Sequence, residues 1–75
     1  MSARAQAGPK TLTLNGSAVR TPAATLADLL AEQGYDTVRA MACAVNGHFV
    51  ARDVWPRQVL HQGDAVEVVS PVVGG

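Results

Sequence analysis

Few residues of this chain could take part in chemistry, and the most informative are the two glycines that end the sequence, Gly74 and Gly75. Glycine reaches backbone conformations that are closed to other residues, and it lets a chain enter a slot too narrow for a Cβ atom. A Gly-Gly pair behind a short apolar tail therefore suits delivery of the Gly75 carboxylate into the active site of another protein. The alternative is an ordinary chain end, because termini commonly fray.

The residues just before the glycines follow a predicted strand directly. Proline fixes φ and lacks a backbone N–H, so Pro71 should stiffen the exit from that strand. Val72 and Val73 find little core left to bury them, and we expect them to enter a partner's active site together with Gly74. The other interpretation packs both valines along the edge of the sheet.

The remaining reactive side chains fit structural roles better than catalytic ones. Cys43 lies in an apolar strand-like segment, where a buried and inert thiol is expected, since an activated thiol needs an electropositive, partly exposed setting. His48 and His61 lie beside predicted turns, and one distant cysteine does not complete a zinc site with them. We therefore predict no intrinsic catalytic residue, no metal site and no bound cofactor.

The acidic residues are assigned to a helix cap, a helix surface, turns and the solvent side of a strand. Arg52 and Asp53 could form a local pair in a loop, of little energetic value if exposed. The seven glycines are scattered and form no phosphate-binding loop. The acidic side chains are Asp28, Glu32, Asp36, Asp53, Asp64 and Glu67.

Composition narrows the class of protein further. Seventy-five residues make one small domain, and a hydrophobic content of 48% with 16% charged residues favours a folded globule of modest stability. The six basic and six acidic residues are dispersed, unlike the footprint of a nucleic-acid binder, and no apolar run approaches the ~20 residues that span a bilayer. Residues 1–9 lack the apolar core of a secretory signal and are expected to be a disordered leader. A single cysteine suits a reducing cytoplasm.

The first predicted elements are a hairpin and a helix. Residues 11–14 alternate polar and apolar side chains, as a half-buried strand does, and Asn15-Gly16 suits a type I′ turn. Residues 17–21 return as a second strand, which brings Val19 to the same core. That strand ends before Pro22, because proline cannot donate to a ladder. A helix follows over Leu26–Gln33, with Thr25 as its N-cap and Gly34 in the left-handed position after its end.

Three more strands complete the predicted sheet. Residues 40–45 form the third strand, with Met41, Cys43 and Val45 on one face, and Asn46-Gly47 turns it into a fourth strand over residues 48–51. Residues 52–56 are irregular or a single helical turn. Residues 65–69 form the last strand, with Val69 directed outward. One helix covers one sheet face, so the expected fold is α+β, a small roll in which a mixed sheet packs against the helix.

With these elements in place, the chain resembles the ThiS family of sulfur carriers, small ubiquitin-like β-grasp proteins of thiamin biosynthesis. The resemblance covers residues 10–75 and is most specific over residues 45–55, 63–68 and the final Gly-Gly pair. It implies residues 10–70 as a β-grasp domain and 71–75 as a flexible tail. It also implies that an adenylating enzyme similar to ThiF uses ATP and magnesium to activate the Gly75 carboxylate. A sulfur donor such as a cysteine desulfurase then leaves a thiocarboxylate, which a thiazole synthase similar to ThiG consumes.

The sequence departs from this family in its longer start and in Pro71-Val72-Val73, which resembles the MoaD family of molybdopterin synthesis. Three alternatives remain. The chain could be a sulfur carrier of the MoaD type for molybdopterin synthesis, a β-grasp interaction module whose terminus is never activated, or a modifier joined to lysines. We expect partners to dock on the tail and on outward strand residues, for which Val69, Pro71, Phe49 and Val50 are the candidates. Trp55 suits either a core or an interface, and the core is favoured.

Overall fold

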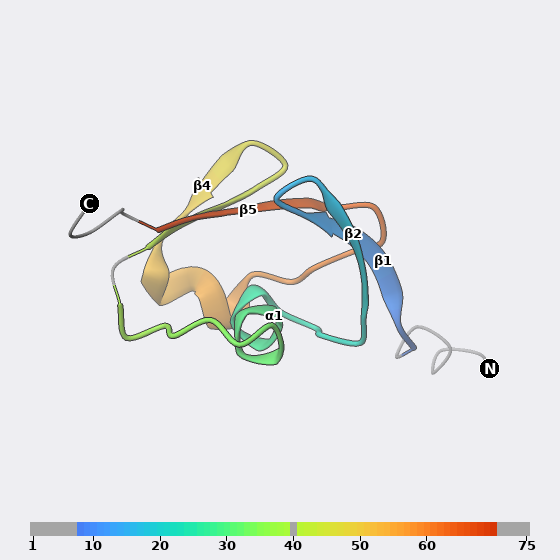
Figure 1. The fold of residues 1–75 in the computed structure, drawn as a ribbon, viewed down its shortest axis with the longest axis horizontal. Coiled ribbons are helices and arrows are strands. Elements are labelled where there is room, and N and C mark those ends of the chain that lie inside the picture. The colour runs from blue at the N-terminus through green and yellow to red at the C-terminus, as the bar shows by residue number, and fades with distance from the viewer. Residues whose placement is uncertain (1–7, 40, 71–75) are drawn as a thin grey trace.

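The structure is a computed structural model that describes residues 8–39 and 41–70 (Figure 1). The order of elements in these residues is strand, strand, helix, strand, strand, 3-10 helix and strand, which agrees with the predicted order. Their bounds are β1 Lys10–Leu14, β2 Ser17–Thr21, α1 Leu26–Glu32, β3 Ala42–Val45, β4 His48–Val50, η2 Arg52–Arg57 and β5 Ala65–Val69.

The strands of the described residues form one five-stranded sheet in the order β2-β1-β5-β3-β4. The central pair β1 and β5 is parallel, while β1 with β2, β3 with β4 and β3 with β5 are antiparallel. The last strand in the sequence is thus the middle strand of the sheet. Helix α1 lies across one face (Figure 1), and the mixed sheet with its single covering layer confirms the predicted α+β fold.

Both predicted hairpin turns are present. Asn15 and Gly16 have φ values of 52° and 86°, and Asn46 and Gly47 have 53° and 81°. Asparagine and glycine tolerate this left-handed region, which a type I′ turn requires at both central residues. The pairs of asparagine and glycine therefore fix the registers of β1 with β2 and of β3 with β4.

The helix begins where the sequence predicts. The hydroxyl of Thr25 accepts a hydrogen bond from the N–H of Asp28 at 3.2 Å, as an N-cap residue should. The helix ends at Glu32, one residue before the predicted end, and Gln33 is its C-cap. Gly34 has a φ of 83°, the left-handed conformation expected just after a helix.

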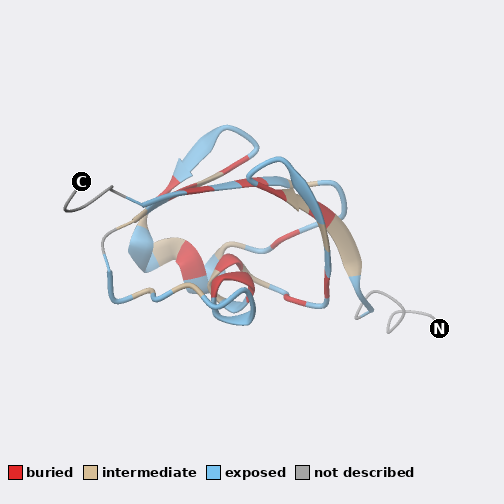
Figure 2. Cartoon of the chain, in the orientation of Figure 1, coloured by how far each residue is buried: buried red, intermediate tan, exposed pale blue. Residues whose placement is uncertain are grey.

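The core lies between the sheet and α1, and its position follows from alternation along the strands (Figure 2). Buried side chains of β1, β3, β4 and β5 face buried leucines of the helix. Val19 and Met41, which the sequence places toward the core, are partly buried and pack against it. The buried apolar residues are Leu12, Leu14, Ala23, Leu26, Leu29, Leu30, Cys43, Val45, Val50, Trp55, Leu60, Val66 and Val68.

The boundaries of the middle strands differ from prediction. Strand β3 begins at Ala42 and β4 ends at Val50, so both are shorter than the predicted ranges 40–45 and 48–51; residue 40 itself lies outside the described residues. Arg52–Arg57 form a 3-10 helix that includes Pro56, longer than the predicted single turn. No helix in residues 8–39 and 41–70 is long and apolar enough to cross a membrane.

Candidate functional site

The structure describes the base of the predicted tail and not the tail itself. Residues 71–75, with the predicted roles of Pro71, Val72, Val73, Gly74 and Gly75, lie outside the described residues, as do residues 1–7 of the predicted leader. These roles and the division into leader, domain and tail stay predictions.

The strand that leads to the tail is held on both sides almost to its end. On one side β3 pairs with β5 as far as Val69, which lies opposite Ala42. On the other side the pairing of β1 ends at Leu14 opposite Val66. Asn15 extends it: its N–H donates to the Val66 carbonyl at 2.9 Å, and its Oδ1 accepts from the Val68 N–H at 2.8 Å.

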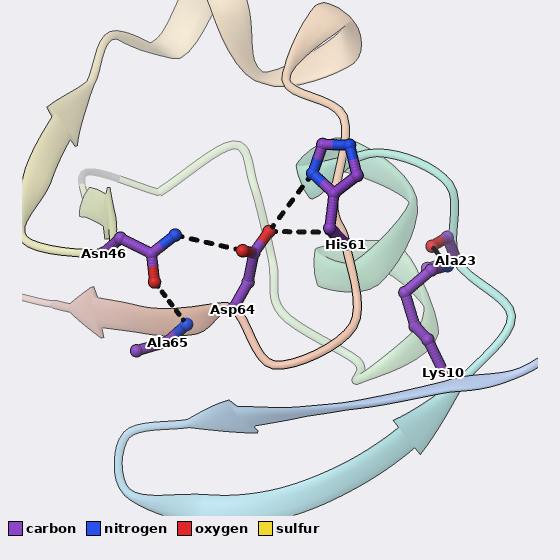
Figure 3. A network of polar contacts seen from close by, with 6 residues as sticks. All are labelled: Lys10, Ala23, Asn46, His61, Asp64 and Ala65. Atoms are coloured by element: carbon purple, nitrogen blue, oxygen red, sulfur yellow. Dashed lines mark hydrogen bonds and ion pairs between the residues drawn. The ribbon is translucent and has the colours of Figure 1, made fainter.

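The beginning of β5 is held by a second asparagine (Figure 3). The N–H of Asn46 donates to the Ala65 carbonyl at 2.7 Å, and its Oδ1 accepts from the Ala65 N–H at 2.9 Å. Its Nδ2 donates to the Asp64 carboxylate at 3.0 Å, and that carboxylate also accepts from the His61 N–H at 2.8 Å. A separate contact in the same view ties Lys10 Nζ to the Ala23 carbonyl at 2.6 Å.

Phe49 and Val69 are the large apolar side chains that the sheet presents to solvent, with exposures of 72% and 64%. Their strand neighbours Val50 and Val68 are buried, so alternation places Phe49 and Val69 on the face opposite α1. Phe49 lies opposite Ala44, and Val69 lies opposite Ala42.

We call these four residues, Phe49, Ala44, Ala42 and Val69, the outer patch. It consists of two bulky side chains with two small ones between them, and it ends at the last residue of β5. The predicted docking residues Phe49 and Val69 therefore share one face of the sheet, at the end from which the tail leaves, and their role in docking stays a prediction.

Val50 does not belong to this surface, which corrects its prediction as a docking residue. It is only 6% exposed and belongs to the core cluster. The reason is alternation: Val50 lies opposite Cys43, which points into the core, so both side chains take the inner face of the sheet.

Trp55 is also a core residue, as favoured from the sequence. Its indole N–H donates to the Val50 carbonyl at 3.0 Å, and the Arg52 guanidinium carbon lies 4.6 Å from the centre of its ring. Arg52 also donates to the carbonyls of Thr37 and Arg39, the latter at 2.8 Å. The predicted local pair of Arg52 with Asp53 is replaced by these contacts, because the guanidinium faces the loop after α1.

The thiol of Cys43 has the properties of a structural side chain. The residue is 2% exposed, and burial raises the pKa of the thiol above its usual value, although the positive charge of Arg52 acts in the opposite direction. A neutral, buried thiol is a poor nucleophile. The described residues contain no group of three His, Cys, Asp or Glu side chains that could hold a metal ion.

The interactions that sequence reasoning missed are those of Asn15, Asn46 and Asp64 with residues far along the chain. The Asn-Gly pairs indicated two turns, but not that each asparagine side chain bonds to β5. His61 and Asp64, three residues apart, also approach within 3.8 Å of each other. An open pocket lined in part by Lys10 and Val59 lies near the start of β1, away from the end of β5.

Comparisons with known proteins agree with this arrangement. A sequence model of the ThiS family matches residues 11–75. The fold is similar to the crystal structure of a thiamine biosynthesis protein, ThiS, from Geobacter metallireducens, with 25% identity and a TM-score of 0.72. That similarity covers 87% of this chain and 99% of the Geobacter chain. No curated protein sequence matches.

The family match spans most of the sequence, from the first strand through the final Gly-Gly pair. The mixed sheet covered by α1 is similar as a whole fold to the matching ThiS structure. This chain belongs to the ThiS family, whose members are sulfur carriers rather than enzymes.

Proposed function

We propose that this chain carries sulfur on the carboxyl group of Gly75 for thiazole formation in thiamin biosynthesis. The observation that carries the proposal is that the family match continues through residue 75, and so includes Gly74-Gly75. Gly75 lies six residues beyond Val69, the end of the central strand. Six extended residues reach about 20 Å, enough to place the carboxylate inside a partner while the domain stays outside.

The chemistry begins with activation, because a carboxylate is a poor electrophile. An oxygen of the Gly75 carboxylate attacks the α-phosphorus of ATP bound with magnesium on a ThiF-like enzyme; pyrophosphate leaves, and an acyl adenylate forms. The sulfur of a persulfide donor, such as one made by a cysteine desulfurase, then attacks the carbonyl carbon and AMP leaves. The product is an acyl disulfide, in which the new bond is the carbon–sulfur bond and the sulfur–sulfur bond comes from the persulfide. A thiol then attacks the donor-side sulfur and breaks that sulfur–sulfur bond, which releases the thiocarboxylate and a disulfide. A ThiG-like thiazole synthase takes up that sulfur.

In this proposal the carrier supplies an acyl group and a docking surface, while its partners supply the nucleophile and the electrostatic stabilisation. The tail, with Val72, Val73 and Gly74, enters the partner's slot. The outer patch and Pro71 contact the surface around that slot. The buried thiol of Cys43 supports this division of roles, because the chain's own cysteine is not placed to act as the sulfur nucleophile.

The test is an intact mass measurement after incubation with a ThiF-like enzyme, ATP, magnesium and a persulfide donor. We expect a mass increase equal to the exchange of one oxygen for sulfur, located in the C-terminal peptide. A variant without Gly75 is the control and should gain nothing. Full sulfur transfer by that variant, or an unchanged mass of the full chain, would refute the proposal, and partner binding without activation would favour an interaction module.

A further inference from the structure

The two hairpin turns share one feature. The backbone of each asparagine turns away from β5, and the asparagine side chain makes the next hydrogen bond to β5 instead. Asn15 and Asn46 have φ values of 52° and 53°, so the backbone of each turns out of its strand. In both residues the N–H still donates to β5, while Oδ1 accepts from β5 in place of a backbone carbonyl.

The geometry at Asn15 follows from the parallel pairing of β1 with β5. Thr13 donates to the carbonyl of Asp64, and Asn15 donates to the carbonyl of Val66, both at 2.9 Å. In a regular parallel ladder the next acceptor for the Val68 N–H would be the carbonyl of Asn15. Oδ1 of Asn15 occupies that place at 2.8 Å, in a partly buried position.

This contact is the hydrogen bond from the β1 side that lies nearest the tail among the described residues. Val68 is the penultimate residue of β5, and Ser70 is the last residue described. Without Oδ1 of Asn15, the Val68 N–H would lose its partner, and the last residues of β5 would be tied to the sheet through β3 alone. A buried or partly buried amide without a partner favours fraying.

We propose that Asn15 is a positioning residue for the activation of Gly75. By holding Val68 it fixes the direction in which the chain leaves the sheet, so that the tail is aligned before a partner binds. Asn15 touches neither the carboxylate nor ATP and acts only through β5. The inference rests on the proposed function, because it assumes that Gly75 is the group that reacts.

Asn46 offers a matched control within the same fold. It has the same backbone conformation and the same use of Oδ1, but it holds Ala65 at the opposite end of β5. It also donates to Asp64, so Asn46→Gly removes at least as many hydrogen bonds as Asn15→Gly. Glycine tolerates positive φ, so neither change strains the turn.

The first measurement is amide hydrogen exchange of the full-length chain by NMR. In Asn15→Gly we expect the Val68 amide to exchange about tenfold faster than in the wild type, while Asn46→Gly leaves Val68 unchanged. Asn15→Asp keeps an oxygen acceptor and a residue that tolerates positive φ, so it should restore the protection of Val68. Equal protection of Val68 in the wild type and Asn15→Gly would overturn the inference.

The second measurement is the rate of acyl-adenylate formation with a ThiF-like enzyme, at a temperature where circular dichroism shows every variant folded. Fraying lowers the fraction of carrier that is ready to bind, which raises KM and leaves kcat unchanged. We expect KM to rise in Asn15→Gly as the inverse of the closed fraction that the exchange data give, up to about fivefold if the frayed form makes up about four-fifths of the carrier, and to stay near the wild-type value in Asn46→Gly and Asn15→Asp.

The outcomes separate the two proposals. If the wild type is not adenylated, the proposed function fails, and the positioning role fails with it whatever the exchange data show. If the wild type reacts and Asn15→Gly behaves like Asn46→Gly, only the positioning role is overturned. A loss of activity that follows the free energy of unfolding across all three variants would also overturn it, because that pattern indicates a general structural role.

Discussion

Phe49 and Val50 are neighbours in β4 with opposite surroundings. Phe49 is 72% exposed on the outer patch, whereas Val50 is 6% exposed and packs in the core. The energetic consequences of truncating them should therefore differ in kind. One side chain is available to a partner, and the other contributes to the stability of the domain.

We predict that Phe49→Ala changes the free energy of unfolding by no more than about 0.5 kcal/mol but weakens binding to a ThiF-like enzyme about tenfold, as loss of a buried aromatic anchor does. Val50→Ala should cost about 2 kcal/mol in stability, through loss of core packing. Urea denaturation and calorimetric titration give the two quantities. Unchanged binding of Phe49→Ala would remove Phe49 from the docking surface.

Arg52 covers the ring of Trp55 and helps to hold it in the core. Its guanidinium group lies over the ring of Trp55 and donates to carbonyls of the loop that follows α1. The ring of Trp55 therefore lies between the core and the guanidinium group. Its indole N–H donates a hydrogen bond to the Val50 carbonyl. Trp55 is thus a residue of the core, 4% exposed.

At the scale of elements, α1 depends on its cap and on the sheet. It spans seven residues, too short to be stable alone. Its buried leucines Leu26, Leu29 and Leu30 hold it to the sheet, and Thr25 satisfies the N–H of Asp28 at its start. Tertiary packing and the cap together compensate for the shortness of the helix.

We expect Thr25→Ala to lower the free energy of unfolding by about 1 kcal/mol, because the N–H of Asp28 loses its acceptor. Thr25→Ser keeps a hydroxyl and should stay within a few tenths of a kcal/mol of the wild type. Chemical denaturation followed by circular dichroism measures both. Equal stability of the alanine and serine variants would show that the cap contributes nothing.

Elements set by neighbouring residues could be predicted from the sequence, and features set by distant ones could not. The Asn-Gly turns, the Thr25 cap and the outward position of Val69 follow from local patterns and are confirmed. The bond from Asn15 to Val68 joins residues 53 positions apart, so it depends on a strand order that alternation does not specify. The inward position of Val50 is set by its pairing with the buried Cys43 of β3, which the sequence of β4 alone does not specify.

The candidate site was predictable in part. Val69 at its base and Phe49, two strands away on the same sheet, are where the sequence places them, on the face opposite the helix. The reactive group itself, Gly75, stays a prediction, because glycines provide no side chain and its role depends on a partner's slot.

At the scale of the whole molecule, the strand that leads to the tail is also the strand that completes the sheet. β5 supplies Val66 and Val68 to the core and pairs with both β1 and β3. Residues 10–69 already supply the five-stranded sheet, its covering helix and a packed core. We therefore expect the domain to fold without residues 71–75.

We predict that a chain ending at Ser70 keeps the wild-type free energy of unfolding within about 0.5 kcal/mol yet accepts no AMP or sulfur. A chain ending at Asp64 lacks the central strand and should be unfolded by circular dichroism. Loss of the fold in the first chain would mean that residues 71–75 contribute to the core, contrary to their proposed delivery role.

The position of β5 also has a mechanical consequence. A force that draws the chain end away along the strand axis acts lengthwise on the ladders with β1 and β3, so their hydrogen bonds resist together in shear and do not open one after another as in a zipper. An enzyme that pulls on the end of the chain would therefore draw the intact domain against the enzyme's surface before β5 separated from the sheet.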